Sequence, residues 1–560
     1  MQKITTWLPQ VITGTIFTGA IAFYLFQFIN QVLTLERFNF SWEWLLLFIV
    51  ASGISFGITL SFKQTRKLHQ ISIAILPSLA FVTLFLLTNR LCAAPFWNWN
   101  AARLAPSFAL AKGYQLYYGT NDGAVLNTIY GPISAILFLP VTLLTSFNGA
   151  IILAATMGAL LTLAPVAYVL LRRPNNRILK LNLFFGFCLY CLADPSLNYS
   201  TFAVHVDSSA LGFGALAAIF LDRDQFHQSS KNLFLSALFA MLSVWSKQVM
   251  LPLLIALPLY LGLSKDFKSL RRYLIYLSVI LVATTGLFSL WFGYDNLIFS
   301  LWTIPTNHGW INGADSLISK LELGFNTLQE LISQSRSLWI TGIFLLLIIP
   351  TATWRNFSQW CAANPGLIFF LCAIATIPTA IAGRVKIGGD VNAFSFPIYF
   401  LLIGCFSMIS ELIETEKKTR FLSITSLIII PLVIFTHLPS FTTSKNTFQE
   451  VLGLADNPRQ KEYLYLRDRP GSIYFPWNPL AGLMAEGKLY HFSYALYDRT
   501  LAGFPLTQAH FDRYLPASYA QNQLKVAADP NDYVITKYLK NFTKQVEVPE
   551  LPGFLVYMPQ

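Results

Sequence analysis

Four groups of ionisable and polar side chains stand inside or beside long apolar stretches of this chain. They are His205 with Asp207; Lys247; Arg384 and Lys386 with Asp390 and Asn392; and Asp122. An ionisable residue at membrane depth costs about 2.5–3.5 kcal/mol on insertion scales, so each of these residues is a functional candidate. Cations suit the binding of a phosphate or diphosphate, whereas carboxylates and histidine suit proton transfer or metal binding.

Each group also has an ordinary structural interpretation. Lys247 could form an inter-helix ion pair with Asp207, and His205 could be a hydrogen-bonded polar residue with no role in chemistry. Arg384 and Lys386 could simply mark the end of a loop. The polar residues that follow the Gly-Gly pair after them could be the N-cap region of the next helix.

The composition places these groups in a membrane protein. Of the 560 residues, 54% are hydrophobic and 12% are charged, whereas a soluble domain carries about 25% charged residues. Residues 130–171 contain no Asp, Glu, Lys or Arg, and about 20 apolar residues already cross a bilayer core. The net charge of +12 would suggest nucleic-acid binding in a soluble protein, but here the basic residues lie in short loops. They therefore indicate orientation in the membrane, and no nucleic-acid partner is expected.

The apolar segments predict about 13 transmembrane crossings, all of them helical because backbone groups cannot stay unpaired in lipid. The segments lie near 11–33, 44–62, 71–89, 130–171, 181–197, 206–221, 232–263, 273–293, 337–354, 366–383, 392–413 and 421–437. Both 130–171 and 232–263 are long enough for two crossings, and the second is expected to turn at Lys247.

Four basic clusters orient the chain if all of them lie in the cytoplasm. They are found at 63–67, 172–180, 265–272 and 417–420. The N-terminus is then cytoplasmic, and the four candidate groups all fall at the extracytoplasmic face. An odd number of crossings is needed between the first outer loop and the second basic cluster. Part of 130–171 is therefore expected to be re-entrant or to lie along the interface.

We therefore predict an all-α polytopic protein of the inner (plasma) membrane with a small C-terminal α/β soluble domain. The expected parts are N-terminal transmembrane helices at 1–89, an outer loop at 90–129, a transmembrane core at 130–440 and an extracytoplasmic domain at 441–560. Residues 99–112 of the outer loop are expected to form a surface helix that ends at Gly113. In the C-terminal domain, strands are expected near 471–477 and 554–557.

The outer loops are rich in aromatic and hydrogen-bonding side chains, which sugar recognition requires. The candidates for sugar or acceptor binding are Trp97, Trp99, Asn100, Arg103, Tyr130, Trp302, His308, Asp390 and Asn392. Aromatic content is also typical of a membrane-surface helix, so it does not by itself identify a site.

Taken together, these features resemble the GT-C superfamily of membrane glycosyltransferases, such as the protein mannosyltransferases and the aminoarabinose transferases. The resemblance covers roughly residues 90–410. It is carried by AARLAPSFALAKGYQLYYG (101–119), YGPISAILFLP (130–140), VDSSALGFGALA (206–217), SVWSKQVMLPLL (243–254) and GRVKIGGDVNAF (383–394). The order and spacing of these runs, more than any one of them, indicate the family.

The resemblance implies the transfer of a sugar from a polyprenyl-phosphate-linked donor at the extracytoplasmic face. The acceptor would be a glycan, a lipid or a protein, and membrane lipid would surround the enzyme. Lys247, Arg384 and Lys386 would hold the donor phosphate and neutralise the charge that develops on it. The walls of the sugar site would be Trp97, Trp99 and Trp302.

The chain departs from the family pattern at one position. Members carry an acidic residue about fourteen positions before the Gly that ends the surface helix, but counting back from Gly113 reaches Trp99. The base for the acceptor hydroxyl is therefore expected to be Asp122 or Asp207, with His205 as its partner or as an alternative base. A divalent metal is compatible with this chemistry, although no ligand spacing indicates one.

Three other functions fit parts of the pattern. A transporter or flippase of lipid-linked sugars would also hold charges in the membrane, but it favours internal repeats, and none is visible. A polymerase or ligase acting on lipid-linked glycans would share the donor. A non-catalytic envelope scaffold would explain the missing loop acid.

Overall fold

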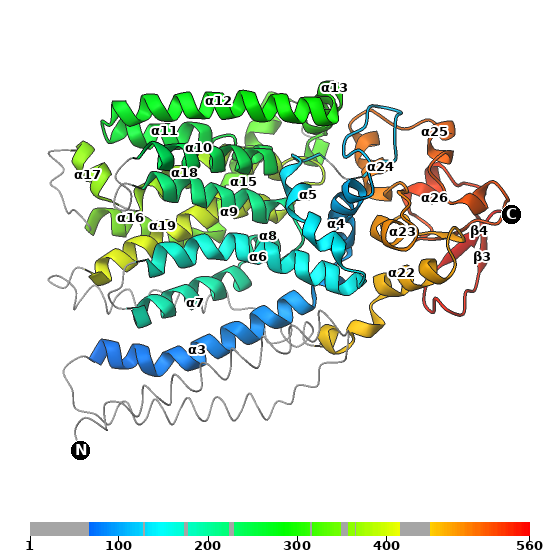
Figure 1. The fold of residues 1–560 in the computed structure, drawn as a ribbon, viewed down its shortest axis with the longest axis horizontal. Coiled ribbons are helices and arrows are strands. Elements are labelled where there is room, and N and C mark those ends of the chain that lie inside the picture. The colour runs from blue at the N-terminus through cyan, green and yellow to red at the C-terminus, as the bar shows by residue number, and fades with distance from the viewer. Residues whose placement is uncertain are drawn as a thin grey trace, which may run out of the picture.

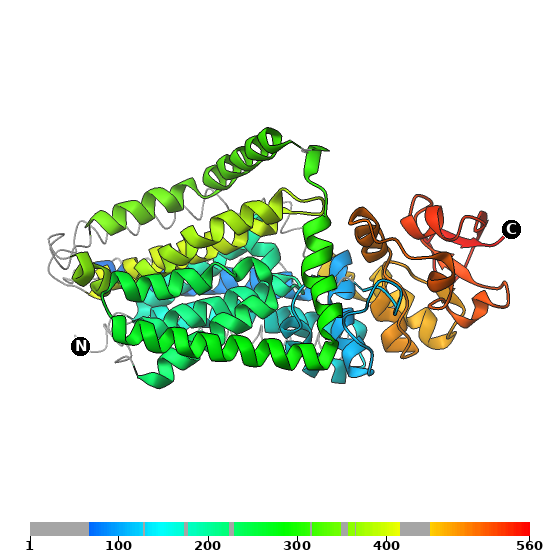
Figure 2. The ribbon, with the colours of Figure 1, turned by 90° about the horizontal axis from the view of Figure 1, so that it is seen from above.

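The computed structural model describes residues 67–126, 129–172, 177–222, 229–313, 316–348, 357–364, 366–414 and 449–560. The helices predicted at 11–33, 44–62 and 421–437, together with the N-terminus, lie outside these residues. In the described part, long helices run side by side, and the C-terminal tail stands beyond one end of them (Figure 1). Figure 2 shows the same arrangement from above, with α12 (Phe267–Phe292) running along the bundle.

The membrane part is built almost entirely of helices. Its α-helices are α3 (Lys67–Cys92), α4 (Asn98–Ala111), α5 (Ile133–Leu137), α6 (Phe147–Leu171), α7 (Arg177–Ala193), α8 (Pro195–Phe202), α9 (Val206–Leu221), α10 (Ser230–Ser246), α11 (Leu253–Leu263), α12, α13 (Tyr294–Ile298), α14 (Ile304–Asn307), α15 (Leu317–Gln334), α16 (Arg336–Ile348), α17 (Phe357–Ala363), α18 (Leu367–Arg384) and α19 (Ser395–Glu414). Short 3-10 turns join several of them, including η2 (Leu139–Leu143), η3 (Gln248–Met250) and η6 (Val391–Phe394).

Several described helices are long and apolar enough to cross a membrane. Four meet this test, namely α6, α12, α18 and the helix Val391–Glu411 that joins η6 to α19. A fifth span is possible if α7 and α8, which are bent by 101° at their junction, are taken as one broken span. The prediction of a mainly helical chain with several membrane-length apolar helices is thus confirmed, whereas the count of about 13 crossings stays a prediction.

The two long apolar segments fold differently from each other. Only the second half of 130–171 is a full-length helix, α6, because the first half forms the short helices α5 and η2. This agrees with the expectation that part of the segment does not cross. The segment 232–263 divides at Lys247, where the backbone is extended (φ −151°, ψ 128°) between α10 and η3. The predicted break at Lys247 is therefore present.

The sequence predicts that the outer loops lie on one side of the membrane and the basic clusters on the other, and the described helix ends agree with this separation. The start of α6 lies at the tail, because Asn148 Nδ2 donates to the carbonyl of Leu454 at 3.0 Å. The basic residues that begin α7 must then lie at the far end of the bundle, as Figure 1 shows. The same view places α4 and α13 at the tail end.

The tail contains helices and one small mixed sheet. Its helices are α22 (Pro458–Asp468), α23 (Pro479–Ala485), α24 (Ser493–Leu501), α25 (Gln508–Asp512) and α26 (Tyr533–Lys537), and its strands are β1 (Ile473–Tyr474), β2 (Lys525–Ala527), β3 (Lys544–Val546) and β4 (Val556–Met558). The strand order is β1-β2-β4-β3, with β1 parallel to β2 and the other pairs antiparallel. β1 and β4 lie where the sequence predicted strands.

The predicted surface helix exists, but it is not exposed. α4 ends at the C-cap Lys112, and Gly113 follows with a left-handed φ of +84°, which glycine adopts without strain. Nine residues of α4 are buried. Six of the nine share one hydrophobic core with α6 and with tail residues such as Leu480 and Phe492. The tail therefore covers α4, which forms a middle layer between tail and membrane helices.

Candidate functional site

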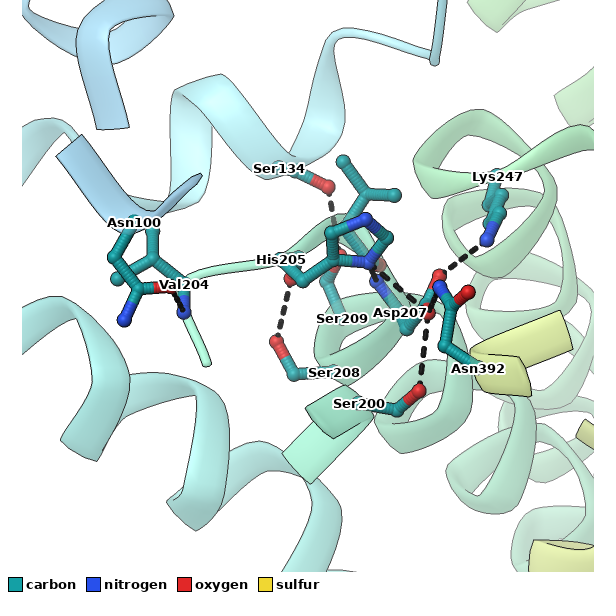
Figure 3. A network of polar contacts seen from close by, with 11 residues as sticks. Asn100, Ser134, Ser200, Val204, His205, Asp207, Ser208, Ser209, Lys247 and Asn392 are labelled. Atoms are coloured by element: carbon teal, nitrogen blue, oxygen red, sulfur yellow. Dashed lines mark hydrogen bonds and ion pairs between the residues drawn. The ribbon is translucent and has the colours of Figure 1, made fainter. Parts of the chain in front are cut away.

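Asp207, in the first turn of α9, is the centre of a buried polar network (Figure 3). Its Oδ1 accepts from Lys247 Nζ at 2.6 Å. Its Oδ2 accepts from Asn392 Nδ2 at 2.7 Å and from Ser200 Oγ at 3.0 Å, and His205 Nδ1 lies 3.0 Å from the same oxygen. Four groups from three separate segments thus surround one carboxylate that is fully buried.

Local structure explains why these residues meet. Lys247 reaches Asp207 because α10 stops at it and the extended backbone turns the side chain inward. Asn392 lies in η6, directly after the Gly-Gly turn and the N-cap Asp390. Ser200 lies in the second half of the bent α7–α8 pair. The ion pair between Lys247 and Asp207, which the sequence offered as a structural alternative, is therefore present.

The position of His205 leaves one ring nitrogen available. Nδ1 is 3.0 Å from Asp207 Oδ2, and the Asp207 backbone N–H points at it from 3.3 Å. That N–H can donate to Nδ1 only if Nδ1 carries no proton, and the Nδ1 lone pair would then face the carboxylate oxygen at the shorter distance. Repulsion between that lone pair and the carboxylate favours the tautomer in which Nδ1–H donates to Asp207 Oδ2. Nε2 then carries a lone pair. The ring lies against Tyr199 and Tyr130, at centroid distances of 5.2 Å and 5.8 Å.

His205 lines a small cavity that we call the inner cavity. Its polar wall is formed by Arg103, Tyr117, Tyr130, Ser134 and His205. Its volume is about 40 Å³. Because a cavity needs roughly 10–15 Å³ to hold one water, the inner cavity has room for only a few waters. Tyr117 Oη donates to the carbonyl of Tyr130 at 2.7 Å and fixes that side of the wall.

Arg103 brings a positive charge to the inner cavity from α4. Its Nε and Nη1 are buried, and neither has a hydrogen-bond partner among the described residues. The guanidinium carbon lies 5.4 Å from the Tyr130 ring centroid and 5.5 Å from that of Trp99. Lys247 is paired with Asp207, whereas two buried guanidinium nitrogens of Arg103 remain without a partner among the described residues at the inner cavity.

Asn100 and the two tryptophans near it support the site instead of lining it. Asn100 Nδ2 donates to the carbonyl of Ala94 at 2.8 Å, and its Oδ1 accepts from the backbone N–H of Val204 at 3.0 Å. This fixes the chain just before His205. Trp97 stacks on Tyr199 at 5.5 Å. Trp99 instead packs edge-on against tail rings, including Tyr494 at 4.6 Å.

The remaining predicted site residues lie elsewhere. Asp122 is exposed in the outer loop beside Gly119, and its backbone carbonyl accepts from Tyr514 of the tail. Trp302 is 63% exposed. Asp390 caps η6. None of the three has a described contact with Asp207 or Arg103.

Arg384 and Lys386 hold a loop together. Arg384 pairs with the exposed Glu330 at 3.3 Å. Lys386 Nζ donates to the carbonyl of His308 at 2.7 Å, and its backbone forms an antiparallel bridge with Trp310. Burial, and then the charge of Lys320, lowers the pKa of Lys386. The structure brings neither cation to the inner cavity.

The tail adds charged residues that the sequence did not single out. Asp498 and Arg499 of α24 are both buried, and His308 Nε2 lies 3.3 Å from Asp498 Oδ1. Burial raises the pKa of Asp498 to about 7, although the charge of Arg103 opposes this rise. Burial, and then the charge of Lys386, lowers the pKa of His308. No local motif marks these residues, because only the docking of the tail gives them their surroundings.

No metal site accompanies these groups. Among the described residues, no cluster of three or more His, Cys, Asp or Glu side chains could hold an ion.

The raised pKa of Asp498 predicts a pH-dependent stability. A carboxyl whose folded-state pKa is raised contributes stability that is fully present below its unfolded-state pKa of about 4 and is lost progressively as the pH rises to about 7. We expect Asp498→Asn to leave the melting temperature unchanged near pH 4 and to raise it near pH 8.5. The difference corresponds to at most about 4 kcal/mol. His308, Arg103 and Tyr494 face this carboxyl. Equal melting curves for both proteins at pH 8.5 would show that Asp498 is not destabilised by ionisation.

Comparisons with known proteins bear on the fold. No protein-family model and no curated protein matches this chain. A crystal structure of ArnT from Cupriavidus metallidurans bound to undecaprenyl phosphate is 11% identical with a TM-score of 0.49, and covers 92% of this chain and 98% of that chain. The apo form is 12% identical with a TM-score of 0.49, and covers 86% and 98%. They say nothing about site residues.

Proposed function

We propose that this protein is a glycosyltransferase that moves a sugar from a polyprenyl-phosphate-linked donor to an acceptor hydroxyl. The inner cavity is the reaction site, and it must widen to admit the donor sugar, because it has room for only a few waters in this structure. The apolar helices around it place the donor's hydrocarbon chain in the bilayer and its phosphate at headgroup level. The predicted orientation puts this chemistry at the extracytoplasmic face of the membrane.

One observation carries the proposal, namely the Arg103 guanidinium beside the His205–Asp207 pair, two of whose buried nitrogens have no hydrogen-bond partner among the described residues. Buried charged N–H groups without hydrogen bonds are costly, so their retention indicates an anionic ligand. A guanidinium matches a phosphate with two parallel hydrogen bonds. Arg103 therefore replaces Lys247, Arg384 and Lys386 as our main candidate for the donor phosphate.

The proton chemistry follows from the orientation of His205. The acceptor hydroxyl attacks the anomeric carbon while His205 Nε2 takes the hydroxyl proton. The bond from the anomeric carbon to the phosphate oxygen breaks, and its electron pair leaves with polyprenyl phosphate. Arg103 neutralises the charge that develops on the departing phosphate.

Asp207 has a positioning role in this proposal. All the contacts described for its carboxylate are with Lys247, His205, Ser200 and Asn392, so it has little room to touch an acceptor. It instead holds His205 in one tautomer and stabilises the imidazolium that forms. This assigns the base to His205, which the sequence offered as an alternative.

The test is donor turnover by the purified protein in lipid nanodiscs. Labelled polyprenyl-phosphoryl sugars are supplied with a membrane glycolipid extract, and released polyprenyl phosphate is measured. We expect turnover by the wild type and a donor KM raised about 10- to 100-fold in Arg103→Gln. Hydrogen bonds to charged groups are worth about 1.5–3 kcal/mol, which gives this range.

The matched control is Arg467→Gln, an exposed arginine of the tail paired with Asp468. It should leave the donor KM unchanged. Wild-type protein that binds the donors but never releases polyprenyl phosphate would contradict the proposal and favour transport. Wild-type protein that binds no donor at all would favour a scaffold.

A further inference from the structure

A second cavity lies between the tail and the outer loops, and we call it the outer cavity. Its lining includes Leu116, Tyr118, Phe299, Ser300, Asp498 and Arg499. These residues come from the loop after α4, from the segment between α13 and α14, and from α24 of the tail. Its volume is about 30 Å³. The tail thus contributes charged side chains to a cavity in which the membrane part supplies the aromatic ones.

The outer cavity adjoins the inner cavity. Leu116 lines both, and the consecutive residues Ile129 and Tyr130 line the outer and the inner cavity respectively. The charge of Arg103, in the inner cavity, also acts on Asp498 in the outer one. The two cavities therefore share one lining side chain and one stretch of backbone.

The polar groups of the outer cavity are incompletely paired. Arg499 is 6% exposed; its Nη2 donates to the carbonyl of Thr120 at 2.7 Å, but its Nε has no partner among the described residues. Asp498 is 5% exposed, and its described polar contact is with His308. A buried polar group without a partner costs roughly 1–3 kcal/mol. A bound molecule that both donates and accepts hydrogen bonds would recover this cost.

Charge and shape indicate what kind of molecule fits. A carboxyl and a guanidinium of adjacent residues suit hydroxyl groups, which donate to the first and accept from the second. An anionic ligand would meet the carboxylate of Asp498, and a cationic ligand would meet Arg499. Phe299 and Tyr118 supply aromatic surface of the type on which a sugar ring packs, and the Arg499 guanidinium lies 5.2 Å from the Phe299 ring centroid.

We propose that the outer cavity is the acceptor subsite, and that it binds a neutral, hydroxyl-rich carbohydrate through Asp498 and Arg499. Calling the ligand the acceptor rests on the proposed function, whereas carbohydrate binding at this place does not. Asp498 and Arg499 determine specificity in this proposal and take no part in the proton transfer, which belongs to His205.

Binding requires the outer loop to move outward, because the cavity holds only a few waters. The loop is fastened to the tail by several hydrogen bonds, which include those of Thr120 and Asp122 described above and two at Val125. Its N–H donates to His491 Nδ1 at 3.0 Å, and its carbonyl accepts from the N–H of Phe492 at 2.9 Å. The loop and the tail would therefore open together.

The test is saturation-transfer NMR on the full chain in lipid nanodiscs, because glycoside detergents would compete. The probes are methyl α-D-mannopyranoside, methyl β-D-galactopyranoside and methyl β-D-glucopyranoside, with inorganic phosphate as the anionic probe. We expect at least one glycoside to bind the wild type and to bind Asp498→Asn at least tenfold more weakly. Phe299→Leu should also weaken it. Asp468→Asn, the same change at an exposed tail residue, should not.

The outcomes separate this inference from the proposed function. Glycoside binding that persists in Asp498→Asn and in Phe299→Leu overturns the subsite, even if donor turnover is intact. Loss of binding in Arg103→Gln but not in Asp498→Asn places the sugar in the inner cavity and also overturns it. Binding of phosphate alone overturns the choice of a neutral ligand. A further result is that glycosides bind the wild type but not Asp498→Asn, while the wild type shows no donor turnover. This result supports the carbohydrate site and contradicts the proposed transferase activity. Melting temperatures show whether each variant is folded.

Discussion

Replacing His205 with glutamine should lower the kcat of sugar transfer by about 10²- to 10⁴-fold, the usual contribution of a general base. Glutamine keeps a donor that can reach Asp207 Oδ2, so the buried network should persist. It has no group that takes a proton from an acceptor hydroxyl. The donor KM should therefore change little, because Arg103 still binds the phosphate. The measurement is the rate of polyprenyl phosphate release at saturating donor, with the melting temperature of each variant as the control for folding.

Asp122→Asn is the comparison that makes this result decisive. Asp122 is the alternative base that the sequence predicted, and the structure places it in an exposed part of the outer loop. We expect Asp122→Asn to retain most of the activity. The reverse result, with full activity in His205→Gln and none in Asp122→Asn, would return the base to the outer loop. It would also require that loop to move into the inner cavity during the reaction.

Much of the fold was predictable because membrane helices are specified by composition. The long apolar run of α6 and the break at Lys247 follow from hydropathy and from the position of single charges. The C-cap at Gly113 follows from a residue type that adopts a positive φ without strain. The covering of α4 by the tail could not be predicted in this way. Its aromatic residues suit a lipid headgroup region as well as they suit a protein core.

The candidate site was predicted in part for a similar reason. Ionisable residues in apolar segments are rare, so His205, Asp207 and Lys247 were visible in the sequence, and the structure joins them in one network. Arg384 and Lys386 were indicated for the same reason. They lie at and just after the end of α18, where Arg384 pairs with Glu330 and Lys386 donates to the carbonyl of His308. Sequence alone does not distinguish a cation that faces a cavity from one that holds a loop.

Asp498 and Arg499 could not have been found from the sequence. They occur in a polar segment of the tail, where an Asp-Arg pair is unremarkable in composition. Their environment is set by the contact of α24 with loops more than 170 residues away in the sequence, for example through His308 and Thr120. Sites formed between a membrane part and a soluble tail are therefore the ones that hydropathy and local motifs miss.

Replacing Lys247 with methionine should prevent accumulation of folded protein. The substitution leaves Asp207 fully buried without its cation, and breaking a buried pair from one side costs about 3–5 kcal/mol. Most domains are stable by only about 5–15 kcal/mol, so this loss is large. The measurement is the yield of monodisperse protein by fluorescence-detected size exclusion, together with its melting temperature. Wild-type yield and stability in the single variant would show that the pair contributes little.

The double variant Lys247→Met with Asp207→Asn separates the structural role of this pair from its role in the reaction. Removing both charges leaves a neutral amide that still bonds with Ser200 and Asn392, so much of the lost stability should return. Activity should stay low, because a neutral amide does not stabilise the imidazolium of His205. Recovery of both stability and turnover would mean that the pair only holds α9 and α10 together. Recovery of stability alone would assign Asp207 to the positioning of His205, which the proposed mechanism requires.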